Sequence, residues 1–180
     1  LISKESCYFL LEIAKKNDVK VIIDLNWREV FWNYSNFSSK ISKKKIFDLI
    51  QIFLNYAHIL KLAKEEALQF FNNENPLDIS KKLLNRPDVI ITNGSEPISW
   101  YINGFQGKTK IINSSMITDT TGAGDAFLSG FISKLILSGY PSNKSEIVDY
   151  VRFASACGLL TCLGEGAIEQ QPDYSKVNEF

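Results

Sequence analysis

The chain has 180 residues, of which 45% are apolar and 22% charged, values typical of one globular domain with a substantial core. Its 20 basic and 20 acidic residues balance to a formal net charge of zero. This balance argues against a nucleic-acid partner, because proteins that bind phosphate backbones carry a basic excess. No apolar run approaches the ~18 residues of a membrane span, so no membrane partner is expected.

The cysteines indicate the cellular compartment of the protein, and the first residue of the chain indicates whether the sequence is complete. Cys7, Cys157 and Cys162 are odd in number and fit no zinc-site spacing. They are typical of reduced core cysteines, which indicates a cytoplasmic protein. The chain opens at Leu1 and its only methionine is Met116, so we expect a fragment of a longer protein.

In chain order, the sequence predicts alternating helices and strands. The expected elements are a helix capped by Ser3, a strand at 19–25, a helix at 46–54, a strand at 57–62, helices at 65–71 and 79–84, strands at 89–92, 98–102 and 105–112, and helices at 123–137 and 145–163. Asn103-Gly104 should form a tight turn between the last two strands. The alternation predicts one α/β domain over residues 1–180, a layered and mostly parallel sheet with helices on both faces.

Small residues gather directly before the helix predicted at 123–137. Gly122 and Gly124 leave no side chain between their amides and a ligand. Successive N–H groups at a helix start form an anion site, and Asp125 follows in the first turn, where the helix dipole favours a carboxylate. A carboxylate beside an anion site suits phosphoryl transfer, because it can accept the proton of the attacking hydroxyl. The alternative is a glycine-rich turn with an ordinary capping aspartate.

The string at 119–127 resembles the signature Asp-Thr-x-Gly-Ala-Gly-Asp-x-Phe of the ribokinase/PfkB carbohydrate kinases, and every fixed position matches. The resemblance implies that Asp125 is the general base and that Gly122, Ala123 and Gly124 form an anion hole. The string is not a Walker A loop, because no lysine follows the glycines.

The resemblance also implies a monovalent-cation site under this loop, with K⁺ as the expected ion. Asp119 and Thr121 would bind the cation from one side. Thr161, Gly164 and Gly166 resemble the second limb of the same site.

Three further positions resemble the family's nucleotide site. Thr92 and Gly94 match a turn that follows the nucleotide phosphates and ribose, and Ser155 occupies a nucleotide-contacting position. Glu66 matches a glutamate that organises Mg²⁺ through water, although Ala63 stands where the family has asparagine. Glu66 is equally well explained as an acidic residue that the dipole favours at a helix start.

The loop after the first strand resembles the Asp-x-Asn-x-Arg…Trp segment of fructokinases and 2-keto-3-deoxygluconate kinases. Trp32 supplies the tryptophan, while Leu25 and Glu29 replace the usual prolines. The resemblance implies that Asn26 and Arg28 face the sugar. The alternative is a loop with packed aromatic residues and a solvated arginine.

As a member of this family, the chain is expected to transfer a phosphoryl group from ATP to a sugar hydroxyl, in a fructokinase-like reaction that uses Mg²⁺ and K⁺. Asp125 would contact the substrate hydroxyl, and the only histidine, His58, is expected to be structural. The chain corresponds to the C-terminal part of a ribokinase-like domain, without the N-terminal half and the β lid that mediates homodimers. Two alternatives remain: a non-catalytic nucleotide-binding fragment or pseudo-enzyme, and a kinase for a nucleoside or vitamin precursor.

Overall fold

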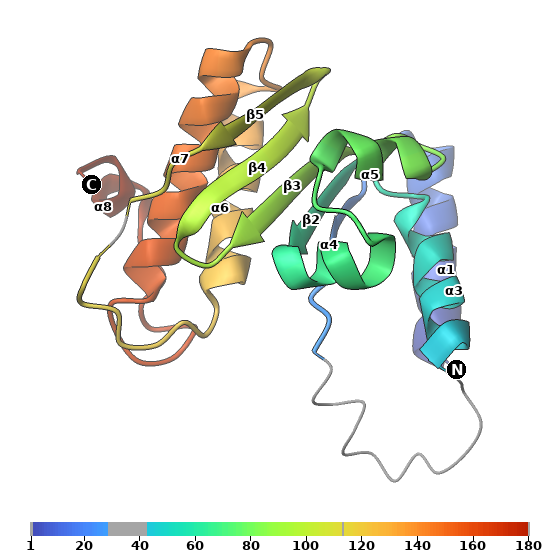
Figure 1. Cartoon of the computed structure of the whole chain (residues 1–180), viewed down its shortest axis with the longest axis horizontal. Helices are drawn as coiled ribbons and strands as arrows, with labels where there is room; N and C mark the ends of the chain where they lie inside the picture. The colour runs from blue at the N-terminus through green and yellow to red at the C-terminus, as the bar shows by residue number, and fades with distance from the viewer. Residues whose placement is uncertain (1, 29–42, 113, 180) are drawn as a thin grey trace, which may run out of the picture. The chain divides into compact units, whose positions relative to one another are not determined.

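The computed structural model describes residues 2–28, 43–112 and 114–179 (Figure 1). The chain forms two compact units, Leu1–Ile91 and Thr92–Phe180. In the described part of the chain, no helix is long and apolar enough to cross a membrane.

The first unit contains parallel strands connected through helices. Its elements are α1 (Ile2–Lys16), β1 (Ile22–Asp24), α3 (Lys43–Leu54), β2 (Ile59–Ala63), α4 (Lys64–Phe71), α5 (Pro76–Lys82) and the start of β3 (Asp88–Asn93). β1 and β2 pair in parallel, with Ile22 opposite Ile59 and Asp24 opposite Lys61. Parallel pairing requires a crossover between the strands, and α3 lies in that crossover.

Aliphatic and aromatic side chains from β2, β3 and the helices form the core of the first unit. The buried members are Leu54, Ala57, Leu60, Leu62, Ala67, Phe71, Ile79, Leu83, Val89 and Ile91. β2 is buried at four consecutive residues, as a strand covered on both faces should be. Asn75 caps α5, because its side-chain oxygen accepts the Leu77 N–H at 3.0 Å, and the helix begins at Pro76.

The second unit joins a β-hairpin to a pair of long helices. Its elements are β4 (Glu96–Ile102), β5 (Phe105–Thr109), α6 (Ala123–Ser138), α7 (Lys144–Thr161) and α8 (Tyr174–Glu179). β4 and β5 pair antiparallel across Asn103-Gly104, whose φ angles are 48° and 78°. Two positive φ angles are typical of the two-residue hairpin turn that Asn-Gly favours, so the predicted turn is confirmed.

α6 and α7 pack antiparallel at close range. A Cβ at Gly130 of α6 would lie 2.6 Å from the Cys157 sulfur and 3.1 Å from the Ala154 Cα. A Cβ at Gly158 of α7 would lie 2.9 Å from the Ala123 carbonyl oxygen. Because neither glycine can carry a side chain without a shift, α7 supports the first turn of α6 through direct backbone contact.

The five strands follow the sheet order β1-β2-β3-β4-β5. The predicted α/β class with a mostly parallel sheet is confirmed, and the β4–β5 hairpin adds an antiparallel pair. Cys157 and Cys162 are buried free thiols as expected, whereas Cys7 is exposed and lies outside the core.

Several predicted element ends are wrong. α1 begins at Ile2, so Ser3 lies inside the helix and not at the position before it. β1 is shorter than residues 19–25, because the Val19 N–H still bonds to the Ala14 carbonyl at the end of α1. β5 ends at Thr109, and α8 was not predicted. The predicted loop residues 29–32 lie outside the described residues.

Candidate functional site

The start of α6 presents two backbone amides that no helix bond uses. Gly122 is the N-cap residue with φ 82° and ψ −5°, and no described side chain caps this helix. The Ala123 N–H bonds to the Thr120 carbonyl at 3.2 Å, and the Ala126 N–H bonds to the Gly122 carbonyl at 2.8 Å. Between them lie the amides of Gly124 and Asp125, which belong to the first turn, where N–H groups have no intrahelical acceptor. The helix start can therefore receive an anion.

Asp125 lies in that first turn of α6 and is exposed. Its carboxylate is within one residue of the free amides, so a bound phosphoryl group and a proton acceptor can share one helix start. The general base expected at Asp125 and the anion hole expected at Gly122-Ala123-Gly124 stay predictions.

Gly122 is required by close packing as well as by its backbone angle. A Cβ there would lie 2.7 Å from the Ala167 Cβ and 3.0 Å from the Ala167 Cα. The segment that follows α7 therefore packs directly beneath the glycine loop.

Asp119 ties this loop to the segment after α7. Its Oδ1 accepts the Thr121 hydroxyl at 2.7 Å and the Thr121 N–H at 2.9 Å, and its Oδ2 accepts the Gly166 N–H at 3.1 Å. The bond from the Thr121 hydroxyl, followed by the two backbone bonds, holds the pKa of the Asp119 carboxyl below its usual value. The Thr118 N–H also bonds to the Cys162 carbonyl at 2.8 Å. The residues expected to form the two limbs of a cation site are thus brought together.

The remaining expected residues of the second unit occupy different surroundings. Thr161 is fully buried, and its hydroxyl donates to the Cys157 carbonyl at 3.0 Å. Ser155 is buried within α7. Thr92 lies near the end of β3, and Gly94 follows in the turn with φ 51°.

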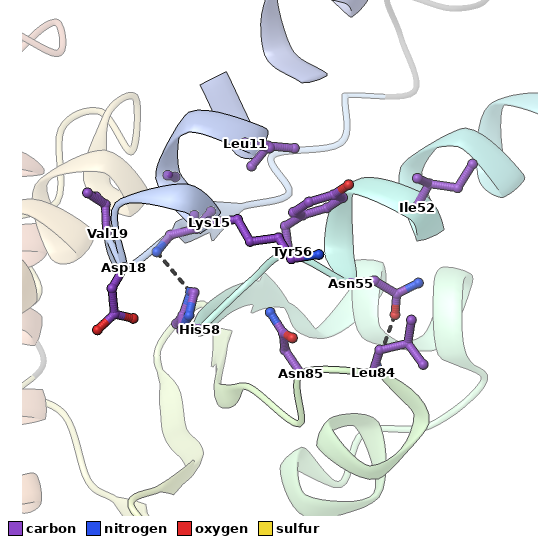
Figure 2. A pocket seen from close by; sticks show the side chains of 12 residues that line it. Leu11, Lys15, Asp18, Val19, Ile52, Asn55, Tyr56, His58, Leu84 and Asn85 are labelled. Atoms are coloured by element: carbon purple, nitrogen blue, oxygen red, sulfur yellow. Dashed lines mark hydrogen bonds between the residues drawn. The ribbon is translucent and has the colours of Figure 1, made fainter. Parts of the chain in front are cut away.

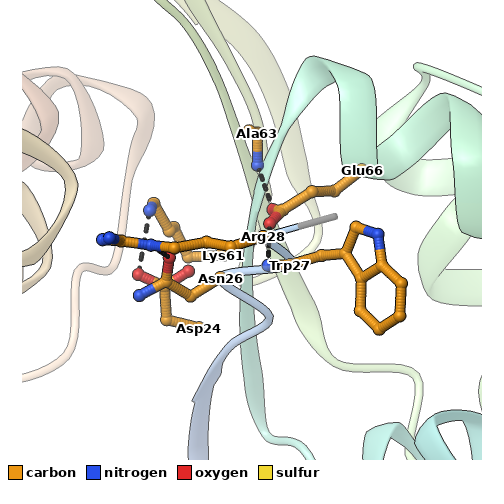
Figure 3. A network of polar contacts seen from close by, with 7 residues as sticks. All are labelled: Asp24, Asn26, Trp27, Arg28, Lys61, Ala63 and Glu66. Atoms are coloured by element: carbon orange, nitrogen blue, oxygen red, sulfur yellow. Dashed lines mark hydrogen bonds and ion pairs between the residues drawn. The ribbon is translucent and has the colours of Figure 1, made fainter. Parts of the chain in front are cut away.

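In the first unit, a buried ion pair links the end of β1 to β2 (Figure 3). Lys61 Nζ lies 2.8 Å from Asp24 Oδ2, with side-chain exposures of 8% and 13%. Asp24 Oδ1 is buried and has no hydrogen-bond partner among the described residues. Sequence reasoning missed Lys61, although a lysine within an apolar buried strand is a signal that an acidic partner is needed.

Asn26 and Arg28 extend from the turn after β1. Asn26 adopts a left-handed backbone with φ 44°, and Arg28 Nε donates to Asn26 Oδ1 at 3.3 Å. Both residues are exposed. In Figure 3 they lie on the same side of the turn as the Asp24–Lys61 pair, while Trp27 points the other way. The structure therefore places the two predicted sugar-facing residues together, on the side of the turn opposite to Trp27.

Glu66 is buried, with 6% exposure, and both of its carboxylate oxygens accept backbone bonds. Oε2 accepts the Ala63 N–H at 2.7 Å and Oε1 accepts the Trp27 N–H. Burial raises the pKa of the Glu66 carboxyl, while these two bonds and nearby Lys61 oppose the rise. Glu66 therefore joins the start of α4 to the turn after β1.

A cavity of about 410 Å³ lies at the opposite, amino-terminal ends of β1 and β2 (Figure 2). Its lining includes Lys15, Tyr56 and His58. His58 Nδ1 accepts the Val21 N–H at 3.0 Å, which anchors the residue before β1. Desolvation, followed by the charge of Lys20, lowers the pKa of His58, and Asp18 opposes this. This bond supports the structural role expected for His58.

Solved structures share this fold. A fructokinase with bound ATP from Xylella fastidiosa matches with a TM-score of 0.79 at 22% identity, covering 98% of this chain and 56% of that one. Aminoimidazole riboside kinase from Salmonella enterica, complexed with aminoimidazole riboside and an ATP analog, matches with a TM-score of 0.73 at 23% identity, covering 94% and 56%. At these identities the likeness establishes a ribokinase-like fold and nothing further.

Curated relatives have related sequences. "Probable fructokinase-6, chloroplastic" of Arabidopsis thaliana is 30% identical over 172 residues, covering 92% of this chain and 42% of the relative. Fructokinase-1 of Zea mays is 29% identical over 175 residues, covering 93% and 50%. The chain spans about half the length of the curated relatives it matches.

The sequence pattern of the pfkB family carbohydrate kinases matches residues 2–173. Because this match covers nearly all of the chain, the chain belongs to the pfkB family of carbohydrate kinases.

Proposed function

We propose that the protein transfers the γ-phosphoryl group of ATP to a hydroxyl of a sugar, with fructose as the first candidate. The observation that carries the proposal is the start of α6, where the uncapped amides of Gly124 and Asp125 adjoin the exposed Asp125 carboxylate. The fructokinases among the curated relatives support the choice of sugar.

In the proposed reaction, the sugar hydroxyl oxygen attacks the γ-phosphorus as its proton passes to the Asp125 carboxylate. The bond from the γ-phosphorus to the bridging oxygen breaks, and ADP leaves. The amides of the Gly122-Ala123-Gly124 loop stabilise the negative charge on the transferring group, which is where such donors contribute most.

Mg²⁺ and K⁺ are proposed to bind at two different sites. The described residues contain no group of three or more His, Cys, Asp or Glu side chains that could hold a metal ion. Mg²⁺ would therefore be held chiefly by nucleotide phosphates and water, as is usual for this ion. Asp119, the Thr121 hydroxyl and backbone carbonyls near Gly164 offer the oxygen ligands that suit K⁺. The ion would neutralise charge beneath the glycine loop.

Asn26 and Arg28 are proposed to contact the sugar, and Thr92, Gly94 and Ser155 to contact the nucleotide. The guanidinium of Arg28 offers a rigid fork of donors that suits hydroxyls, a carboxylate or a phosphoryl group. We further propose a cytoplasmic location, supported by the free cysteines of the described chain, and a homodimer for the complete protein.

The test is an ADP-release assay of the complete protein, as its gene encodes it, over fructose, 2-keto-3-deoxygluconate, ribose and adenosine. We expect the highest kcat/KM on fructose. The highest value on ribose or adenosine would overturn the substrate and leave phosphoryl transfer intact.

Asp125→Asn tests the general base in the same assay. We expect kcat to fall about 10³-fold, because the variant cannot accept the proton, while ATP binding is nearly unchanged. Asp78→Asn is a matched control, since Asp78 is also exposed in a helix first turn. A variant at Asp125 that keeps a tenth of the wild-type kcat would refute the assignment.

A further inference from the structure

One face of α4 contacts the Asn26–Arg28 turn at two points. Glu66 and Phe70 are four residues apart and so lie on the same side of the helix. Glu66 accepts the Trp27 N–H through Oε1. The Phe70 ring packs edge-on against the Trp27 ring, with centroids 5.4 Å apart and planes at 79°.

α3 completes the enclosure of the Trp27 side chain. The Phe47 ring lies 5.9 Å from the Trp27 ring at 82°, and Phe47 and Phe70 are 4.4 Å apart. Edge-to-face pairs of aromatic rings stabilise a fold by more than the burial of their apolar area alone. Trp27 is therefore held by its ring and by its backbone, from residues of α3 and α4 that lie later in the chain.

The position of Trp27 determines where its neighbours point. With Trp27 directed toward α4, Asn26 and Arg28 extend to the opposite side of the turn, beside the Asp24–Lys61 pair (Figure 3). Asn26 reverses the chain direction through its left-handed backbone. Trp27 and its two flanking side chains thus lie on opposite sides of the turn.

We propose that Glu66, together with Phe70, is a positioning residue that holds Trp27 and so directs Asn26 and Arg28 to the substrate. This inference rests on the proposed function. Glu66 then acts through the turn after β1. Its burial, with each oxygen already bound to a backbone N–H, supports this role.

Glu66→Gln is the main test, because glutamine keeps one accepting oxygen and replaces the other with a donor. It can satisfy only one of the Ala63 and Trp27 amides. In the complete protein we expect kcat/KM for the sugar to fall about tenfold, since small misplacement of a binding group has effects of this size. The Mg²⁺ concentration for half-maximal activity should not change. Glu65→Gln, on the exposed neighbouring residue, is the matched control.

Arg28→Ala separates positioning from a direct role. If Glu66 acts through the turn, the double variant of Glu66→Gln and Arg28→Ala should lose little more kcat/KM for the sugar than Arg28→Ala alone. Phe70→Leu should likewise raise the KM for the sugar. Because this variant leaves the Glu66 carboxylate intact, it tests the proposal even if Glu66→Gln folds poorly. A severalfold rise in the Mg²⁺ requirement with an unchanged sugar KM would overturn the proposal.

Hydrogen exchange of the Trp27 amide gives a readout that needs no activity. Its exchange should become severalfold faster in Glu66→Gln than in Glu65→Gln, because Glu66 accepts the Trp27 N–H and Glu65 is exposed. Equal exchange in the two variants would refute the positioning role. If the complete protein phosphorylates none of the sugars, the proposed function fails, while this measurement still decides the role of Glu66.

Discussion

The Lys61–Asp24 pair places two opposite charges almost out of water inside a predominantly apolar strand region. Such a pair depends on both members, because removal of one leaves the other charge buried without compensation. The pair also lies at the point where β1 ends and the turn with Asn26 begins.

Lys61→Met should therefore lower the free energy of unfolding by about 3–5 kcal/mol. Lys64→Met is the control, because Lys64 pairs with Glu74 at 3.1 Å on the surface, with exposures of 38% and 58%. An exposed pair of this kind contributes about 0–1 kcal/mol. Denaturant unfolding of both variants measures the difference, and equal losses would contradict the importance of the buried pair.

Asp119 is a partly exposed carboxylate whose accepted hydrogen bonds favour the ionised form. Its pKa is below the usual value of 3.8, chiefly because of the Thr121 hydroxyl. A carboxyl group with a depressed folded-state pKa stabilises the fold above its unfolded pKa. That contribution is lost as the pH falls through the folded-state pKa.

Thr121→Val should accordingly move the Asp119 titration midpoint upward toward 3.8, since it removes the hydroxyl donor and keeps the side-chain shape. NMR titration of the Asp119 carboxyl measures the midpoint. Asp173 provides the reference, because its pKa is lowered by bonds from Lys176 and Ser175 and should not respond. An unchanged Asp119 midpoint would show that the hydroxyl bond is not the main cause.

At the scale of elements, α6 depends on contacts at its first turn from α7 and from the segment after it. A Cβ at Gly158 would collide with the Ala123 carbonyl oxygen, and a Cβ at Gly122 would collide with Ala167. The helix start is consequently fixed by packing and not by a side-chain cap. Fixed donors suit electrostatic stabilisation, because they need no reorganisation during the reaction.

Gly122→Ala should destabilise the fold through two effects, a left-handed backbone and a collision with Ala167. Gly104→Ala is the control, because Gly104 has φ 78° and nothing within 4 Å of an added Cβ. Backbone strain alone costs about 1–3 kcal/mol. Denaturant unfolding should show a larger loss for Gly122→Ala than for Gly104→Ala. Equal losses would mean that the packing against Ala167 relaxes freely.

For the whole molecule, the chain spans about half the length of its curated relatives and yet contains the complete glycine loop of α6. Its nucleotide-facing groups are expected to lie within this span, at Thr92, Gly94 and Ser155. Because the chain contains these residues, nucleotide binding can be measured directly on it.

The 180-residue chain should bind Mg·ATP in a calorimetric titration. Binding of AMP should be weaker, because AMP lacks the phosphates that the α6 amides would receive. Circular dichroism of the same sample verifies that the chain is folded. A folded chain that gives no heat with Mg·ATP would contradict the nucleotide site.

The sequence by itself determined the α/β class, the hairpin turn at Asn103-Gly104 and the placement of Asp125 in a helix first turn. These features depend on local preferences: apolar periodicity, the left-handed backbone that Asn-Gly tolerates, and small residues before a helix. Element ends were less well predicted at Ser3 and at residues 19–25, because helix ends and pairing partners depend on neighbours distant in sequence.

Only the tertiary structure decided which distant groups meet. Lys61 meets Asp24 because β1 and β2 pair in one register, and Glu66 meets the Trp27 amide because α4 packs against the turn after β1. Position 122 has no room for a side chain, because Ala167 lies against it. Local sequence patterns contain no information on such contacts, since they arise from the packing of segments about forty residues apart.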